Sequence, residues 1–511
     1  MNSERQPFSS LPIAAIFLWA LLITAGFVFY AWLSTGATYA GLVADDAIYL
    51  LMAERFSLGT LQLPVHQYVN QVSHFPPLFP LLLAAAKIGS NDIGAAHWLQ
   101  CALIGLASLA IGAYALSLSK HWAAATVSLA LILISPATLL LSVELWSEFV
   151  FIALLYIGLC LLIKDKTSNL ELILASLLLG LSAITRGFGI LAIAALVLHI
   201  TLKKPRRVLP AILFSLIPMA LSALAGWGGN RSYYEIFRDR VTSFEKLVNV
   251  IGENAQAAWR AWIYLFDRTP DPISITFCVL VLLLAIPLLV KRLRNFDIDG
   301  LFCAAYLSLL MIWPFPAVME RLLYPVAPIL IIYALISVSS SHTLLVRTRS
   351  LGEGKSRTTL PLAALAIVLI FLSVASSKSL IQRRLEPLPD AMHYLAPSRN
   401  WMSIQDRARA RGRIDNAHGI ITGLKRAATE IPTGDCVYSQ RPQIVMLYTL
   451  RPSFPSPRDK SERSTRQCQY HLLINDGSLK LGLDAMWPDY EVLFTAKNAG
   501  MTNVILARYH N

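Results

Sequence analysis

The sequence has little charge for its length. Only 15% of its 511 residues are Asp, Glu, Lys or Arg, whereas 55% are hydrophobic, and the mean hydropathy is +0.55. Soluble globular chains carry about 25% charged residues. The deficit, together with apolar runs long enough to cross a bilayer, predicts a polytopic membrane protein.

The sequence also lacks the motifs of several common sites. Its six cysteines form no CxxC pair and no zinc-type Cys/His spacing, and no glycine-rich phosphate loop is present. Four of the cysteines lie in apolar runs, where Cys behaves as a small hydrophobe. The other two, Cys436 and Cys468, lie in the C-terminal region, and the sequence leaves open whether they form a disulfide. The first apolar run, about 11–33, has no convincing cleavage site and is interpreted as a signal anchor.

The net charge of +13 does not indicate nucleic-acid binding, because most basic residues lie in short clusters between apolar runs or in the C-terminal region. The apolar run at 78–88 is too short for an ordinary crossing and is predicted to be re-entrant or interfacial. If it does not cross and Met1 is cytoplasmic, five basic connections fall on the cytoplasmic side, as the positive-inside rule requires. They lie at 120–121, 164–166, 203–207, 291–294 and 347–357.

The remaining apolar runs complete a scheme of about eleven transmembrane helices within residues 1–377. After the span at 11–33 comes a first external loop, 34–96, that contains the interfacial helices. The further spans are expected at 97–118, 122–141, 145–163, 170–185, 187–202, 208–226, 272–290, 300–316, 322–340 and 359–377. The segment 227–272 is read as an external loop.

The C-terminal region, 378–511, is more charged than the rest. Short β-like runs separated by turn signals predict a small extracytoplasmic α/β domain. The runs are Cys436–Ser439, Ile444–Tyr448, His471–Ile474, Tyr490–Phe494 and Val504–Arg508.

Two adjacent carboxylates, Asp45 and Asp46, follow the first span. A charged side chain at the centre of a membrane helix costs about 2.5–3.5 kcal/mol, so acids beside such a helix need an explanation. One explanation is an N-cap on a surface helix that faces water. The other is a general base at the outer edge of the membrane, its pKa raised by partial desolvation and by the second acid. Tyr49 lies one helical turn after Asp45 and could brace its carboxylate.

The topology puts further charged residues on the same outer face. His74 precedes Pro76-Pro77 at the start of the interfacial run, and reads as a surface histidine more readily than as a ligand. Glu148 lies near the head of a span, where the helix dipole favours an acid, but it is already inside an apolar run. Arg186 separates two apolar runs. The adjacent pair Glu320-Arg321 starts a later span, where Arg321 either snorkels, pairs with Glu320 or binds a phosphate.

These pieces occur in an order that resembles the membrane-embedded GT-C glycosyltransferases. The likeness covers about 1–340 and is strongest to the branch of protein O-mannosyltransferases and lipid A aminoarabinose transferases. It is carried by the acid pair, Pro76-Pro77-Leu78, Ser147-Glu148, the run 181–187 and the run 320–325. The chain departs from the family pattern at Phe75, where the family often has Lys or His, and at Leu322, where an aromatic is usual.

The resemblance implies roles for individual residues. Asp45 would be the base and Asp46 its neighbour, Glu148 a second acidic residue of the pocket, and Arg186 and Arg321 the ligands of a carrier phosphate. We therefore expect Asp45 and Asp46 to be catalytic. We expect the other residues to bind substrate, namely Tyr49, His74, Glu148, Arg186, Glu320 and Arg321.

The function predicted from these residues and the resemblance is inverting glycosyl transfer from a polyprenyl-phosphate carrier to an acceptor hydroxyl of a glycolipid, lipopolysaccharide or protein. The reaction would occur at the outer face of a bacterial inner membrane, with the N-terminus cytoplasmic. No cofactor is required, although a divalent metal ion could bridge phosphate and carboxylates. The alternative is a transporter or flippase of lipid-linked sugars, which would place ionisable groups near the bilayer midplane, often within repeated halves. An external receptor on a membrane anchor would not need so many spans.

Overall fold

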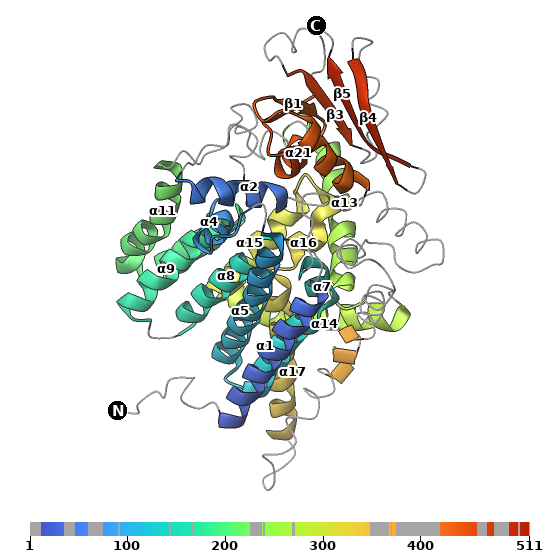
Figure 1. The fold of residues 1–511 in the computed structure, drawn as a ribbon. Helices are drawn as coiled ribbons and strands as arrows, with labels where there is room; N and C mark the ends of the chain where they lie inside the picture. The colour runs from blue at the N-terminus through green and yellow to red at the C-terminus, as the bar shows by residue number, and fades with distance from the viewer. Residues whose placement is uncertain are drawn as a thin grey trace.

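The structure, a computed structural model, describes most of the chain apart from several connecting segments. The described residues are 12–34, 46–59, 75–89, 92–142, 145–164, 167–224, 238, 241–267, 271–347, 367–368, 370–371, 373–374, 419–456, 468–474, 490–498 and 501–509. They form a helical bundle with a five-stranded sheet at one end (Figure 1).

The bundle is built mostly from apolar helices. Its N-terminal half contains α1 (Ile13–Leu33), α2 (Asp46–Ser57), α4 (Leu78–Ala85), α5 (Ile93–Ser119), α6 (Trp122–Ile134), α7 (Pro136–Ser142), α8 (Glu148–Leu162) and α9 (Asn169–Ala183). The rest contains α10 (Gly189–Lys203), the 3₁₀ turn η2 (Pro205–Arg207), α11 (Val208–Leu224), α13 (Phe244–Tyr264), α14 (Pro272–Arg294), α15 (Ile298–Met311), η3 (Pro316–Val318), α16 (Met319–Leu323) and α17 (Ala327–Arg347).

Four of the described helices are long and apolar enough to cross a membrane: α1, α5, the helix Pro205–Leu224 and α14. Six shorter apolar helices lie beside them, namely α6, α8, α9, α10, α15 and the segment Ala327–Val338 of α17. The short α4 agrees with the interfacial helix expected at 78–88. The predicted count of eleven spans stays a prediction, because most of the expected last span at 359–377 lies outside the described residues.

Two predicted spans are interrupted by proline, so their prediction as single helices is wrong. The span expected at 122–141 divides at Ser135, whose ψ of 133° is extended, into α6 and α7. A residue before proline disfavours the helical region, which explains the break before Pro136. The span expected at 322–340 begins instead with the short α16, and α17 starts only after the turn that contains Pro325.

The segment 227–272 is not a loop throughout, which corrects the sequence-based interpretation. It contains α13, a helix of 21 residues. The side chain of Ser243 caps the helix by accepting from the backbone N–H of Lys246 at 3.3 Å. Buried Val250, Asn254 and Ala261 follow helical spacing, whereas Phe244 and Val248 are exposed. The helix is amphipathic, so its mean hydropathy over 18 residues is lower than that of a membrane-spanning helix.

The C-terminal sheet has the order β2-β1-β3-β5-β4. Strands β2 (Ser453–Pro455), β1 (Val437–Ser439) and β3 (Tyr470–Ile474) are parallel, and β5 (Met501–Tyr509) pairs antiparallel with both β3 and β4 (Tyr490–Asn498). Four of the five predicted β-like runs are strands. The prediction of a strand at Ile444–Tyr448 is wrong, because this apolar run lies in the helix α21 (Pro442–Thr449). Cys436 and Cys468 form a disulfide, with their Cα atoms 4.9 Å apart.

The sheet and the bundle share a hydrophobic contact. Figure 1 shows α2 across the end of the bundle, with α21 and the sheet beyond it. The contact is made by α21, which meets α2, and the buried side chains of Ile421, Met446 and Leu447 belong to the same core as the bundle helices. The other buried side chains of this region form a separate core beneath the sheet. The acid-bearing helix α2 therefore lies between the bundle and the C-terminal region.

Candidate active site

Helix α2 begins at Asp46, and eight consecutive residues from Asp46 to Ala53 are buried. The Asp46 carboxylate is 1% exposed, and its Oδ1 accepts from the backbone N–H of Ala47 at 3.0 Å. An acid in the first turn is stabilised by the free N–H groups and dipole of the helix. Asp45, the predicted base, lies outside the described residues, as does His74.

Tyr49 joins α2 to the beginning of α8. Its hydroxyl lies 3.3 Å from Ser147 Oγ, and its ring makes edge-on contacts with Phe75 and Phe79, at 5.9 and 5.2 Å between centroids. Phe75 therefore supports the tyrosine ring at the position where the family often has a basic residue. The predicted brace between Tyr49 and Asp45 stays a prediction.

The carboxylate of Glu148 holds two arginines from distant parts of the chain. Both Arg186 and Arg321 form ion pairs with its Oε1. The Glu148 side chain is fully buried, and those of Arg186 and Arg321 are only 10% and 17% exposed. Sequence reasoning placed the three on one face but did not predict this pairing, because they are separated by up to 173 positions. We call the three residues the Arg–Glu–Arg cluster.

A tight turn between α9 and α10 holds Arg186. Its backbone N–H donates to the carbonyl of Ser182 at 3.0 Å, and the backbone N–H of Gly189 donates to the carbonyl of Arg186 at 2.8 Å. A Cβ at Gly189 would lie 2.4 Å from the backbone nitrogen of Ala183, so only glycine fits this turn. The N–H of Leu78 donates to Ile184 at 3.1 Å, which fixes the start of α4 beside the same turn.

Arg321 is held by aromatic side chains around α16. Its guanidinium carbon lies 3.5 Å above the ring centroid of Trp146, a cation–π contact. The Tyr306 hydroxyl donates to the carbonyl of Leu322 at 2.8 Å, and the Tyr156 hydroxyl donates to Pro325 at 2.9 Å. Trp146 and Tyr306 were not identified from the sequence. Trp146 stands two residues before Glu148, which is the only signal that could have drawn attention to it.

The Arg–Glu–Arg cluster leaves hydrogen-bonding groups unused. Within the described part of the chain, Glu148 Oε2 and Trp146 Nε1 are buried and have no hydrogen-bond partner. Buried polar atoms are normally paired, and exceptions often mark positions that a ligand or water fills. With two guanidinium groups and one carboxylate, the cluster carries a net positive charge. Together with Trp146 it therefore offers an N–H donor, an oxygen acceptor and positive charge to a bound group.

The predicted site residues are thus brought together in part. Tyr49 contacts Ser147, the residue just before Glu148 of the Arg–Glu–Arg cluster, and Asp46 lies on the same helix as Tyr49. Glu320 lies beside Arg321 on α16 and is partly buried. No group of three or more His, Cys, Asp or Glu could hold a metal ion within the described ranges, which include neither Asp45 nor His74. The divalent metal ion stays a prediction.

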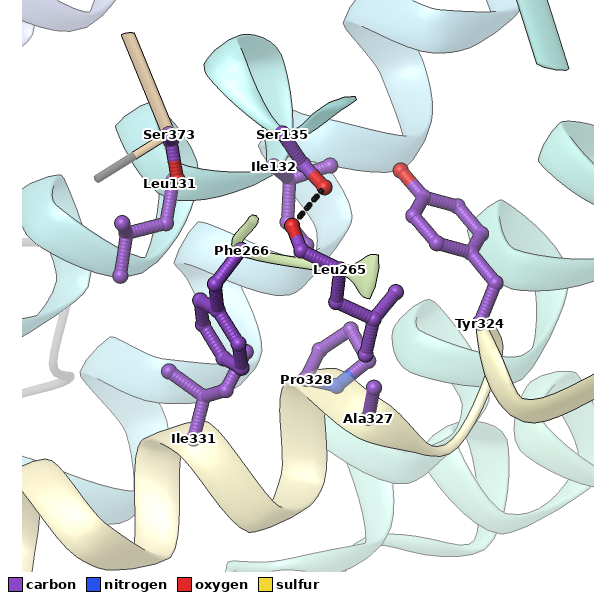
Figure 2. Close-up of a pocket in the computed structure, with 10 residues that line it drawn as sticks. All are labelled: Leu131, Ile132, Ser135, Leu265, Phe266, Tyr324, Ala327, Pro328, Ile331 and Ser373. Atoms are coloured by element: carbon purple, nitrogen blue, oxygen red, sulfur yellow. Dashed lines mark hydrogen bonds between the residues drawn. The ribbon is translucent and has the colours of Figure 1, made fainter. Parts of the chain in front are cut away.

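A small pocket lies elsewhere, between α6, the turn after α13 and α17 (Figure 2). Its lining is mostly apolar, with polar groups only on Ser135, Tyr324 and Ser373. Ser135 Oγ donates to the carbonyl of Leu265 at 2.9 Å across one wall. No charged side chain lines the pocket, so it offers no counter-charge to a phosphate.

Comparison of the whole chain with solved structures identifies the fold. The structure matches the archaeal oligosaccharyltransferase AglB from Archaeoglobus fulgidus, solved with an inhibitory peptide and a dolichol-phosphate, at 11% identity and a TM-score of 0.50. The match covers 95% of this chain and 74% of that one. The chain has a GT-C fold.

Two further structures match this GT-C fold more weakly. One is ArnT from Cupriavidus metallidurans bound to undecaprenyl phosphate, at 12% identity and a TM-score of 0.48, with 96% of this chain and 98% of that chain covered. The other is the arabinofuranosyltransferase AftD from Mycobacteria, at 14% identity and a TM-score of 0.47, with 96% of this chain but only 40% of that chain covered. No family model and no curated protein matches the sequence.

Proposed function

We propose that this chain is an inverting glycosyltransferase that moves a sugar from a polyprenyl-phosphate carrier to an acceptor hydroxyl. The observation that supports this most strongly is the buried Arg–Glu–Arg cluster beside the start of the acid-bearing helix α2. A carrier phosphate needs fixed positive charge at the level of the headgroup, and the acceptor needs a carboxylate to take its proton. The solved neighbour AglB, which shares the fold, was itself found with a lipid phosphate.

In the proposed reaction, the acceptor oxygen attacks C1 of the sugar while the bond between C1 and the phosphate oxygen breaks. Asp45 takes the proton of the acceptor hydroxyl, and the carrier leaves as a phosphomonoester. Because the nucleophile approaches opposite to the leaving group, the configuration at C1 inverts. Arg186 and Arg321 stabilise the charge that develops on the leaving phosphate.

Each remaining group has a position that suits a role in this reaction. Asp46, at the start of α2, holds negative charge beside Asp45 and so favours its basic function. Trp146 Nε1 can donate a hydrogen bond to an oxygen of the phosphate or sugar, and Glu148 Oε2 can accept a hydrogen bond from a sugar hydroxyl. Tyr49 links α2 to the beginning of α8 through its contact with Ser147.

The reaction would occur on the outer side of the membrane, in a bacterial inner membrane with the N-terminus in the cytoplasm. Helix α8 begins at Glu148 and runs for 15 residues toward Lys164, so the cluster and this basic residue are about 22 Å apart along the axis. The positive-inside rule assigns the Lys164 end to the cytoplasm.

Transfer of a labelled sugar tests the proposal. Purified protein in nanodiscs is given an undecaprenyl-phosphate-linked sugar with a soluble or lipid hydroxyl acceptor, and product and C1 configuration are read by NMR. We expect turnover with inversion, and loss of turnover in Arg186→Ala. The matched control is Arg206→Ala, which removes an exposed arginine from η2 at the opposite end of α10. Equal activity of both variants, or retention at C1, would contradict the proposal.

A further inference from the structure

We propose that Glu148 sets the charge preference of the phosphate site. It would make the site favour the singly charged phosphodiester of the sugar donor over the doubly charged phosphomonoester left after transfer. The inference rests on the proposed function, and it assigns to Glu148 control over release of the spent carrier. It starts from the presence of a buried acid where an anion is expected to bind.

The charge count follows from the contacts. Arg186 and Arg321 are permanently protonated, and both form ion pairs with Glu148. Two positive groups around one buried carboxylate keep it ionised, so the three side chains together carry one positive charge. A site built only to capture phosphate would gain from leaving out the acid. Its presence instead removes half of the positive charge from the cluster.

The other ionisable groups near Glu148 are neutral or acidic, so they add no positive charge to the cluster. Tyr306 on α15 faces the cluster as a neutral phenol that donates to the carbonyl of Leu322. On α16, Glu320 is partly exposed, so water and salt screen its charge. The proposed function also places the carboxylate of Asp45 at the reacting sugar, where its negative charge disfavours a dianion further. The turn between α9 and α10 contributes Arg186 itself.

The charge of the cluster decides which anion it holds best. Attraction to the cluster grows in proportion to the charge of the ligand, whereas the cost of removing an ion from water grows roughly with the square of its charge. A cluster with one positive charge matches a phosphodiester with one negative charge. The second charge of a phosphomonoester gains one more unit of attraction but raises the desolvation cost roughly fourfold. Without Glu148 the doubled positive charge would favour the dianion.

Transfer itself creates this difference in charge. The bond between C1 and the phosphate oxygen breaks, and that oxygen becomes a second ionisable position on the phosphate. The second pKa of a phosphomonoester is about 6, so the spent carrier is mostly a dianion at neutral pH. Glu148 then lies next to an anion with more charge than the cluster can balance, which favours its departure.

The experiment compares two probes that differ only in this second charge: undecaprenyl phosphate and its methyl ester. Their affinities for purified protein in nanodiscs are measured at about pH 5.5 and about pH 7.5, on either side of the second phosphate pKa near 6. In the unchanged protein we expect undecaprenyl phosphate to bind more weakly at the higher pH, and the methyl ester to bind equally at both. Tighter binding of undecaprenyl phosphate at the higher pH would overturn the inference.

Glu148→Gln supplies the second arm. It keeps the shape of the side chain and removes its charge, so the preference for the methyl ester over the dianion should fall by about a hundredfold to a thousandfold, as expected for charges 4–6 Å apart at an effective dielectric near 20. Glu148→Asp keeps the charge and should keep the preference. An unchanged preference in Glu148→Gln would overturn the inference.

The two arms also separate this inference from the proposed function. If neither probe binds the unchanged protein, the proposed function fails and the inference fails with it. If both probes bind but the preference does not depend on Glu148, only the inference fails. Should Glu148→Gln not fold, as judged by circular dichroism, the pH dependence of the unchanged protein decides alone.

Discussion

At the scale of single residues, the account depends on two carboxylates with different surroundings. Glu148 is fully buried between two arginines, whereas Asp46 starts a helix and lies beside Asp45. An acid fixed between two cations is a poor base, because proton uptake would leave both guanidinium groups without their partner. This difference favours the acid pair, and not Glu148, as the acceptor of the proton.

The first prediction tests the assignment within the acid pair. Asp45→Asn should lose about 10²–10⁴-fold in turnover while still binding a polyprenyl-phosphate donor, because asparagine keeps the shape but cannot act as a base. Asp46→Asn should lose less. Asp92→Asn, which alters an exposed carboxylate just before α5, is the control and should turn over normally. Normal activity of Asp45→Asn together with an inactive Asp46→Asn would reverse the assignment.

The second prediction concerns Tyr49 and Ser147. Because the rings of Phe75 and Phe79 still support the side chain, Tyr49→Phe should fold and lose about 0.5–1.5 kcal/mol of stability with the hydrogen bond. Ser147→Ala should cost a similar amount, and the double variant should lose less than the sum of the two single losses, because both single variants remove the same contact. The measurement is the free energy of unfolding of all four proteins in one detergent. Additive losses would show that the contact contributes nothing.

At the scale of elements, the sequence predicted the apolar helices well because their signal is local. Helices α1, α5, α8, α9 and α10 lie within a few residues of their predicted ranges. The failures have physical causes: Pro136 and Pro325 interrupt runs whose hydropathy is continuous. The apolar run Ile444–Tyr448 has strand-like composition, but the structure places it in α21, which packs Met446 and Leu447 against α2.

The site residues illustrate the same limit. The predicted topology placed Glu148, Arg186 and Arg321 on the outer face, and the structure joins these three in ion pairs. Their pairing depends on how α8, the turn before α10 and α16 meet in space, which no local pattern reveals. The cation–π contact of Arg321 with Trp146 was missed for the same reason.

The opposite end of the bundle has an ion network that gives a third prediction. Asp299 is fully buried and accepts from Arg292 Nη2 at 2.6 Å and from the Tyr114 hydroxyl at 2.8 Å. Asp299→Asn removes one of the two acids paired with Arg292, whose Nη1 still contacts Asp297 at 2.8 Å, and should cost about 1.5–3 kcal/mol of stability. Affinity for a lipid phosphate, corrected for the folded fraction, should not change. A selective loss of affinity without loss of stability would assign this network to substrate binding.

The contact between α21 and α2 gives a fourth prediction. Leu447 is buried in the core shared with the bundle, so Leu447→Asp should detach α21 from the acid-bearing helix. We expect turnover to fall more than donor affinity, because Arg186 and Arg321 are paired with Glu148 at the start of α8. Val492→Asp, at an exposed position on β4, is the matched control and should behave as the unchanged protein. Equal activity of both variants would show that α2 keeps its position without the C-terminal region.

At the scale of the whole molecule, charge is divided between two ends of the helices. The Arg–Glu–Arg cluster lies where α8 begins, and the network of Arg292 and Asp299 lies where α14 ends. A transporter would be expected to hold its ionisable groups near the bilayer midplane instead. The division agrees with the proposed site at one surface of the membrane.

The fifth prediction is topological. If the C-terminal region is extracytoplasmic, the Cys436–Cys468 disulfide should form in cells, since that compartment is oxidising. Denatured protein from cells lysed with a thiol-blocking reagent should show the two cysteines protected until a reductant is added. Lys204, just after α10, should resist an impermeant amine reagent in intact cells. Free thiols at both positions would place the C-terminal region in the cytoplasm, and labelling of Lys204 would place that residue outside it; either result would contradict the predicted topology.

The most direct test of the central claim is a cryo-EM structure of the protein in nanodiscs with undecaprenyl phosphate. The account predicts phosphate density in contact with the guanidinium groups of Arg186 and Arg321, beside Trp146 and the beginning of α2. Phosphate density away from these two arginines, for example near the bilayer midplane, would contradict it.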